Sequence, residues 1–114
     1  MSEPVSVTDE FMREQMTRSR DYVLVLLHQG PSYGTDGFER IVWEHGRRNF
    51  QLRAQRLLSI VGPVRDDTPL CGIGIFDGSI EQVTSVMNAD PGVQAGIFTF
   101  EVHPMRSFPG DALA

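Results

Sequence analysis

Lysine is absent from this chain of 114 residues, and cysteine occurs only once. All ten basic residues are arginines, so no lysine can form a Schiff base with a carbonyl substrate. The single cysteine, Cys71, excludes a disulfide within the chain. Its neighbours in sequence are apolar and none is basic, which favours a thiol packed in the core over a reactive one.

Long apolar runs and an excess of positive charge are also missing. The longest apolar run, Tyr22 to Leu27, is too short to cross a bilayer. The N-terminal segment carries several acidic residues and lacks the apolar core of a secretory signal. The formal net charge of -5 argues against a nucleic-acid partner. We therefore expect a cytoplasmic protein that binds neither membranes nor nucleic acids.

The apolar pattern predicts the order strand, helix, strand, strand, helix, strand. The expected strands span residues 22–28, 58–64, 70–76 and 97–103, and the expected helices span residues 38–57 and 79–89. This is the order of the ferredoxin-like split βαβ fold, an α+β class with a four-stranded antiparallel sheet and both helices on one face. The other face would remain apolar, so we predict a homodimer in which a second copy covers it.

Residues 1–20 are predicted to form a partly helical extension before a single domain of residues 21–114. Thr8 has the spacing of an N-cap for a short helix with two acidic residues in its first turn. The apolar side chains of this helix would share one narrow side: Phe11, Met12 and Met16. The extension is then either a docking arm or a loosely packed segment.

Residues 70–76 alternate apolar side chains with glycine. Cys71, Ile73 and Ile75 would lie on one face of the strand, and Gly72 and Gly74 on the other. Glycine weakens a strand, so we expect another group to approach the glycine face closely. The two glycines do not form a dinucleotide-binding fingerprint, and no phosphate-binding loop occurs. We therefore expect no cofactor.

His45 lies on the apolar side of the longest predicted helix. At about 100° per residue, it shares that side with Phe38, Ile41, Val42, Asn49 and Leu52. Burying an imidazole and an amide is unfavourable unless both find partners or the helix face lines a cavity. Gly46 removes a side chain beside the ring. His45 is therefore either a core residue bonded within the protein or a polar group in a pocket.

Several short motifs follow one another at characteristic intervals. An apolar first strand is followed by a helical histidine, a Gly-Pro closing the second strand, an Asp-Pro step after the second helix, and a small-residue lead into the last strand: Tyr22–Leu27, His45, Gly62-Pro63, Asp90-Pro91 and Ala95–Phe98. In this order and spacing, residues 22 to about 105 resemble the YCII-related proteins of the dimeric α+β barrel group. Arg56 stands where members of the family often have glycine.

The resemblance implies a small dimeric protein with a pocket centred on a His-Asp pair, which corresponds to His45 and Asp90. A few members resemble lyases or isomerases of ring-cleavage and chloroaromatic pathways, including a dehydrochlorinase. Asp90 also has a simpler explanation, because aspartate directly before proline is a preferred N-cap of a helical turn. One carboxylate oxygen is available for each role.

Three hypotheses remain open. The first is a cofactor-free lyase or isomerase in which His45 transfers a proton, Asp90 orients it, and Asn49 and Tyr22 contact a small anionic substrate, aromatic-derived or a lactone. Arg53 would either clamp a substrate carboxylate or lie at the surface. The second is a non-catalytic dimer that binds a small molecule or a protein. The third is a structural histidine, with function carried by the N-terminal arm.

Two further groups of polar residues have simpler interpretations. Arg47 and Arg48 fall on the solvated side of the helix, where both can pair with Glu44. His28 and His103 end the first and last predicted strands and, with His45, lack the spacing of metal ligands. We therefore expect no metal site.

Overall fold

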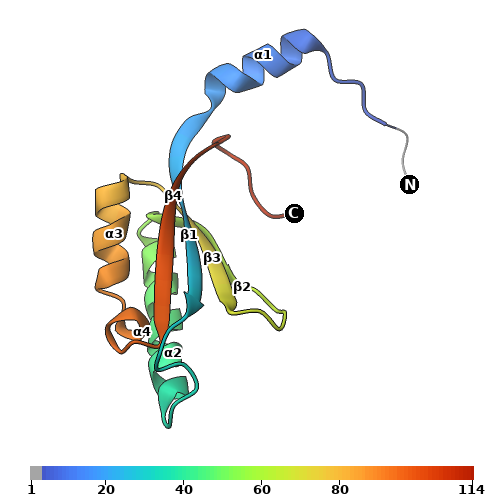
Figure 1. Cartoon of the computed structure of the whole chain (residues 1–114). Coiled ribbons are helices and arrows are strands. Elements are labelled where there is room, and N and C mark those ends of the chain that lie inside the picture. Colours follow the sequence, from blue (N-terminus) through green and yellow to red (C-terminus); the bar gives the residue numbers. More distant parts are fainter. Residues whose placement is uncertain (1–3) are drawn as a thin grey trace.

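Four antiparallel strands form one sheet in the computed structural model, which describes residues 4–114. The elements in chain order are α1 (Asp9–Arg18), β1 (Arg20–Gln29), α2 (Phe38–Ala54), β2 (Leu58–Pro63), β3 (Leu70–Phe76), α3 (Ile80–Asn88), α4 (Pro91–Gln94) and β4 (Phe98–Ser107). The strands lie in the order β2-β3-β1-β4 (Figure 1). The predicted α+β fold is confirmed, and residues 1–3 of the predicted extension lie outside the described residues.

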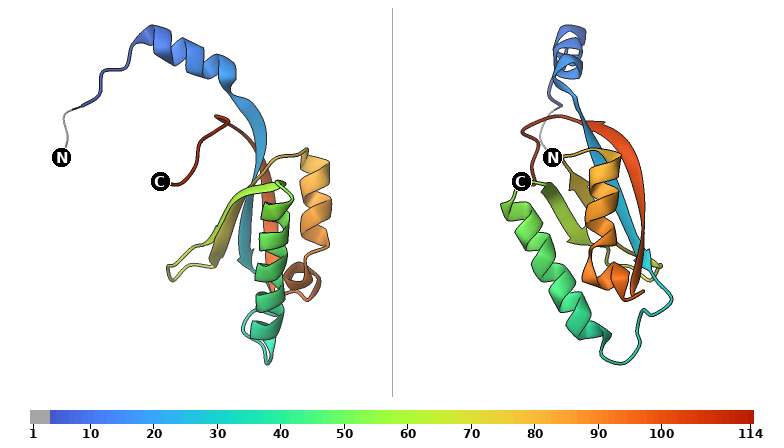
Figure 2. Two further views of the ribbon diagram at one scale, coloured as in Figure 1. Left: turned by 180° about the vertical axis from the view of Figure 1, so that it is seen from behind. Right: turned by 90° about the vertical axis from the view of Figure 1, so that its left-hand side faces the viewer.

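The helices α2 and α3 pack on one face of the sheet (Figure 2). Every second residue of β1 is buried under them, because side chains of a strand alternate between its two faces: Val23, Val25 and Leu27. These residues form a core with Leu58 and Phe76 of the sheet and with apolar side chains of the helices: Leu52, Val83 and Met87. None of the helices in residues 4–114 is long and apolar enough to span a bilayer.

The helix α2 ends at Ala54, three residues earlier than predicted. Arg56 has a φ angle of 62°, which is left-handed and cannot continue a right-handed helix. The amide of Leu57 then donates to the carbonyl of Leu52, a reversal of the chain typical of a helix C-terminus. Glycine adopts this backbone conformation most easily, and Arg56 adopts it here to end the helix.

The other ends of elements follow local signals. Ser79 and Gln82 form the predicted capping box, with bonds of 2.8 and 3.1 Å at the start of α3. Thr8 caps α1 as predicted and accepts from the amide of Phe11 at 3.1 Å. The strand β4 extends to Ser107, beyond the predicted end at residue 103, because it pairs with β1 along the whole length of that strand.

The glycines of β3 lie on the face that the helices cover, and both are buried. A Cβ atom on Gly74 would lie 3.2 Å from the Phe76 ring and 3.3 Å from Leu58 Cδ1. On Gly72 it would lie 2.9 Å from the carbonyl oxygen of Gly62. The close approach predicted from the sequence therefore comes from groups in the sheet itself. Because neither position has a side chain, space remains open between the sheet and α2.

The opposite face of the sheet is not covered by a helix within residues 4–114 (Figure 2). Apolar side chains of the three strands β1, β3 and β2 lie half-buried on this open face: Leu24, Leu26, Ile60, Ile73 and Ile75. The helix α1 extends away from the domain on the side opposite α3 (Figure 1), and none of its residues is buried. Residues 4–114 thus present two apolar surfaces that no other described part of the chain covers: the open face of the sheet and the apolar side of α1.

Candidate functional site

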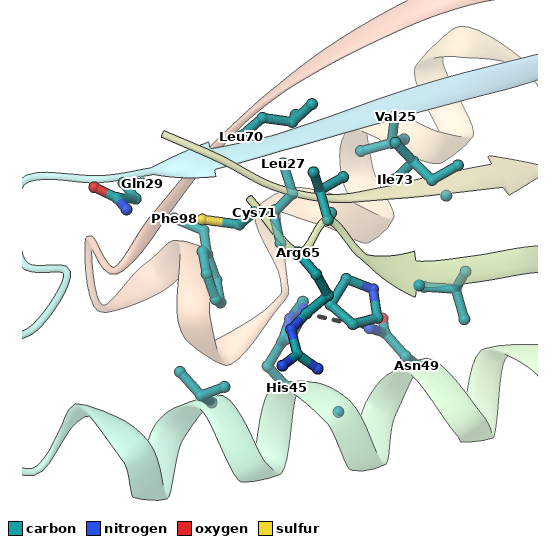
Figure 3. A pocket seen from close by; sticks show the side chains of 18 of the residues that line it. Val25, Leu27, Gln29, His45, Asn49, Arg65, Leu70, Cys71, Ile73 and Phe98 are labelled. Atoms are coloured by element: carbon teal, nitrogen blue, oxygen red, sulfur yellow. Dashed lines mark hydrogen bonds between the residues drawn. The ribbon is translucent and has the colours of Figure 1, made fainter. Parts of the chain in front are cut away.

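A cavity of about 790 Å³ lies between α2 and the helix-covered face of the sheet. Its walls are mainly apolar and come from β1, α2, β2 and the start of β4: Val25, Leu27, Val42, Leu58 and Phe98. Its polar side chains come chiefly from α2 and from the connection between β2 and β3: His45, Asn49, Arg53 and Arg65. Figure 3 shows His45 and Asn49 side by side on α2, facing the strands. The apolar side of α2 therefore lines a cavity rather than a sealed core.

His45 is paired with Asp90 inside this site. The ring nitrogen Nδ1 lies 2.8 Å from Oδ1 and 2.9 Å from Oδ2 of the carboxylate, and the Asp90 side chain is 1% exposed. A carboxylate accepts the hydrogen of Nδ1, so the neutral ring carries its proton there and Nε2 is an acceptor. The amide nitrogen of Asn49 lies 3.3 Å from Nε2 and donates to it. Asp90, which is 45 positions away from His45 in the sequence, thus fixes one tautomer of the histidine ring.

Asp90 also caps α4. Its Oδ2 atom accepts from the amides of Gly92 at 2.9 Å and Val93 at 3.2 Å, and Pro91 begins the helix. Burial raises the pKa of Asp90, but the hydrogen bond and charge of His45 and the two amides outweigh it, so the pKa lies below its usual value. The capping contact and the histidine contact therefore coexist in one carboxylate.

Phe98, at the start of β4, packs against the histidine ring, and Gly92 of α4 packs against Phe98. The rings of Phe98 and His45 lie 4.8 Å apart between centroids, at an angle of 47°. A Cβ atom on Gly92 would lie only 2.6 Å from Cδ2 of Phe98. Glycine at this position allows α4 to bring the Asp90 carboxylate and the Phe98 ring against the same imidazole.

Arg48 does not pair with Glu44, which corrects the prediction for this residue. Arg47 forms that contact at 2.8 Å, whereas the Arg48 side chain is only 23% exposed and its NH1 atom lies 3.7 Å from Oδ1 of Asp90. NH1 is buried and has no hydrogen-bond partner within residues 4–114. Because Arg48 follows His45 by three residues, it lies one turn along the helix on a neighbouring side. A helical pattern alone does not show on which side of α2 its long side chain turns.

The remaining predicted site residues divide between the two faces of the sheet. Asn49 and Arg53 line the cavity, and the Arg53 guanidinium lies 5.4 Å above the exposed ring of Phe50. Tyr22 does not line the cavity, because it alternates with the buried Val23 and so lies on the open face. Its predicted contact with the substrate therefore finds no support in the position of the side chain.

Arg65 is a lining residue that the sequence did not single out. It lies in the connection between β2 and β3, which the sequence predicts only as a turn. Figure 3 shows its side chain directed toward α2 and His45. The neighbouring Asp66 also lines the cavity and accepts from the amide and hydroxyl of Thr68 at 3.1 and 2.6 Å. Only the folding of β2 against β3 brings this arginine to the cavity.

The other two histidines lie on the open face of the sheet. Nε2 of His28 lies 2.5 Å from Glu101, and Nε2 of His103 lies 3.6 Å from the same carboxylate. The hydrogen bond from His28, with the charges of both histidines, lowers the pKa of Glu101 although desolvation opposes it. Neither histidine lines the cavity. Among residues 4–114, no three His, Cys, Asp or Glu side chains gather as a metal-binding group.

Comparison with known proteins shows what this arrangement is similar to. No family model matches the chain, and no curated protein matches it. Among solved structures, it is similar to 5-chloro-2-hydroxyhydroquinone dehydrochlorinase from Burkholderia phenoliruptrix AC1100, in complex with 2,5-dihydroxybenzoquinone. The identity is 18%, the TM-score is 0.51, and the match covers 72% of this chain and 90% of that chain. The two proteins share the fold, a four-stranded antiparallel sheet with the β-α-β-β-α-β order of the dimeric α+β barrel group.

Proposed function

We propose that this protein is a YCII-like enzyme, a cofactor-free lyase or isomerase that transfers a proton through His45. The observation that carries this proposal is the Asp90 carboxylate, 2.8 Å from Nδ1 of a histidine that lines a cavity. A carboxylate in this position fixes the ring so that Nε2 is free of its own proton. It also stabilises the imidazolium that forms when Nε2 accepts a proton.

The proposed reaction begins at Nε2 of His45. The bond from Asn49 is long, at 3.3 Å, and a bound substrate would replace it. Nε2 then takes a proton from a carbon or oxygen atom of the substrate, and the electron pair of that bond stays on the substrate. In an isomerase the imidazolium returns the proton to a different atom. In a lyase the electron pair forms a double bond and expels the leaving group with the electrons of its own bond.

The walls of the cavity suggest the class of substrate. A volume of about 790 Å³ is sufficient for a small ring compound, and the apolar side chains suit an aromatic-derived molecule or a lactone. Arg53 and Arg65 line the same cavity and each can bind an anionic group of a substrate, while Asp66 and Asp67 of the β2–β3 connection line it as well and balance their charge. The similar solved structure is a dehydrochlorinase in complex with a dihydroxybenzoquinone, which supports this class.

A second candidate function is non-catalytic binding of a small molecule in the same cavity. It is favoured by the low exposure of the His45 side chain, 11%, and by the contacts that occupy both ring nitrogens. In that case the His-Asp pair would only shape the binding site. The two candidates differ in whether a bound compound is converted.

Turnover in heavy water tests the proposed reaction. Hydroxylated chloroaromatics and small lactones would be incubated with the protein in D₂O and followed by mass spectrometry and by chloride release. We expect deuterium incorporation or loss of chloride for at least one compound that binds in calorimetry, because the proton on Nε2 exchanges with solvent. Compounds that bind tightly but remain unlabelled and unconverted would favour the binding function instead.

We also propose that the protein is a homodimer joined through the open face of its sheet. The centre of that face is apolar in β1 and β3, and the polar cluster of Glu101 and His103 on β4 and His28 near the end of β1 lies beside it. A self-complementary apolar patch of this kind is typical of two-fold dimers. The YCII-related proteins, which this chain resembles in sequence, are also dimeric.

Leu26→Glu tests this dimer. Leu26 pairs with Ile73 in the middle of the open face and does not line the cavity, so a carboxylate there would be desolvated on both copies. We expect a dimer for the natural chain and a monomer for Leu26→Glu in sedimentation velocity at micromolar concentration. Ser85→Glu adds the same charge at an exposed position of α3 and should leave the dimer intact. A natural chain that sediments as a monomer would contradict the proposal.

A further inference from the structure

Arg48 lies beside the pair of His45 and Asp90 but outside the cavity. Its side chain is 23% exposed, and its buried NH1 atom lies 3.7 Å from Oδ1 of Asp90. Arg48 does not line the cavity, whereas Arg53 and Arg65 do. A substrate in the cavity would therefore meet the ring of His45 but not the guanidinium of Arg48. Any effect of Arg48 on a reaction must pass through Asp90.

The contact between Arg48 and Asp90 is one of charge rather than a hydrogen bond. A distance of 3.7 Å is too long for an N–H donor, and NH1 has no hydrogen-bond partner within the described part of the chain. Burying a guanidinium nitrogen without an acceptor is unfavourable, and a long arginine side chain can usually place it in water. Two amides of α4 already bond to Oδ2 of Asp90, so Arg48 approaches Oδ1, which also faces Nδ1 of His45.

The charges of these three side chains favour a neutral imidazole. With a neutral His45, the negative Asp90 and the positive Arg48 leave the buried group without net charge. Protonation of the ring would give the group a net positive charge beside a carboxylate that is only 1% exposed. Without Arg48 the balance reverses, because the imidazolium would then be the only cation next to Asp90. Burial disfavours net charge, so the guanidinium shifts the ring toward its neutral form.

We propose that Arg48 is a positioning residue, which compensates the charge of Asp90 and so keeps His45 neutral and able to accept a proton. This inference rests on the proposed function for its catalytic meaning. A general base must be unprotonated when the substrate binds. Asp90 alone would favour a ring that already carries the second proton. With Arg48 present, Asp90 still orients the ring, and the imidazolium formed in the reaction gives up its proton more easily.

The other charged groups around the ring leave this balance to Arg48. Those that line the cavity come from α2 and from the β2–β3 connection, and their charges cancel: Arg53, Arg65, Asp66 and Asp67. None of the described strand residues in the lining is charged. The titratable strand residue there is Cys71, and burial raises the pKa of its thiol, which stays uncharged. Tyr33 adds an uncharged phenol from the β1–α2 connection.

An NMR titration tests the inference without a substrate. The chain has three histidines, and the Cε1 proton signal of His45 is the one that disappears in His45→Gln. Arg48→Met removes the charge and retains an unbranched side chain. We expect it to shift the midpoint of the His45 titration to higher pH. Arg48→Lys retains the charge and should restore most of the midpoint. The signals of His28 and His103, on the open face, should not move.

Arg47→Met is the matched control for this titration. It removes the same charge one position earlier, from an exposed side chain that pairs with Glu44. We expect it to leave the midpoint of His45 unchanged. Arg48→Gln is a second neutral variant, and thermal unfolding shows whether each chain keeps its fold. Equal midpoints in Arg48→Met, Arg48→Gln and the natural chain would overturn the inference.

The pH profile of kcat/KM separates this inference from the proposed reaction. In Arg48→Met we expect its acid limb to move to higher pH, with a severalfold loss of activity at about pH 6 and little loss at about pH 9. A variant with only a structural defect would lose activity equally across the profile, which would contradict the role of Arg48. A shifted NMR midpoint without turnover of any compound would support the control of His45 by Arg48 and contradict only the proposed reaction. Turnover with an unshifted midpoint would do the reverse.

Discussion

His45→Gln is expected to lower the rate of proton transfer by about 100-fold to 10,000-fold, the usual contribution of a positioned general base or acid. Glutamine has the size to fill the space between Phe98 and Asn49 and keeps hydrogen-bonding groups near Asp90. It has no group that takes up a proton near neutral pH. The measurement is kcat/KM for the first compound converted in the heavy-water screen.

The control for this variant is His103→Gln. His103 is exposed on the far face of the sheet and does not line the cavity, so kcat/KM should remain within a factor of about two. Thermal unfolding of both variants shows whether the fold is retained. Binding affinity measured by calorimetry should change far less in His45→Gln than turnover does, because the histidine acts mainly in the transition state. Unchanged turnover in a folded His45→Gln would contradict the proposed mechanism.

The fold was largely predictable because its signals are local. The apolar run of β1, the alternation in β3 and the capping box at Ser79 each depend on neighbouring residues, and each prediction was confirmed. The end of α2 was not predictable from these signals. Arg56 is an ordinary helix-forming residue, and its left-handed conformation depends on how the chain turns toward β2.

The candidate site was predictable only in part, since it is made of contacts distant in sequence. His45 was conspicuous as a polar residue on an apolar helix face, and Asp90 as an aspartate before proline. Arg48 and Arg65 gave no such signal, because an arginine on a helix or in a turn is ordinarily solvated. Their approach to Asp90 and to the cavity follows from the packing of α2 on the sheet and from the β2–β3 connection. Tyr22 was assigned to the cavity without knowledge of which face of β1 the helices cover.

Asp90→Ala is expected to destabilise the protein by about 3 kcal/mol or more, because it removes one member of a buried pair. It leaves the Nδ1 hydrogen of His45 and the amides of Gly92 and Val93 buried or half-buried without an acceptor. At about 4 °C per kcal/mol for a chain of this size, the melting temperature should fall by about 12 °C. Thermal unfolding followed by circular dichroism measures the change.

Asp90→Ser separates the two roles of the carboxylate. A serine hydroxyl can still accept from the amide of Gly92 or Val93, and an N-cap of this kind contributes about 1 kcal/mol. It is too short to reach His45. We therefore expect Asp90→Ser to be more stable than Asp90→Ala by about 1 kcal/mol but still well below the natural chain. If Asp90→Ser were as stable as the natural chain, the carboxylate would be only a helix cap, and the His-Asp pair would not contribute to the fold.

The pH dependence of stability provides an independent measure of the same pair. The pKa of Asp90 is lower in the folded protein than its value of about 3.9 in an unfolded chain, so the unfolded state binds more protons in acid. The stabilisation is present above that value and is lost as the pH falls through the folded pKa. The natural chain and Asp90→Ser should therefore differ most in free energy of unfolding near neutral pH and converge toward pH 2. A difference that stays constant over this range would mean that Asp90 is not held ionised by His45 and the α4 amides.

Asp66 and Glu101 also have lowered pKa values, but both residues are present in the two chains, so their effects on the free energy of unfolding cancel in the comparison. The convergence is thus specific to the carboxylate on which the proposed proton transfer depends.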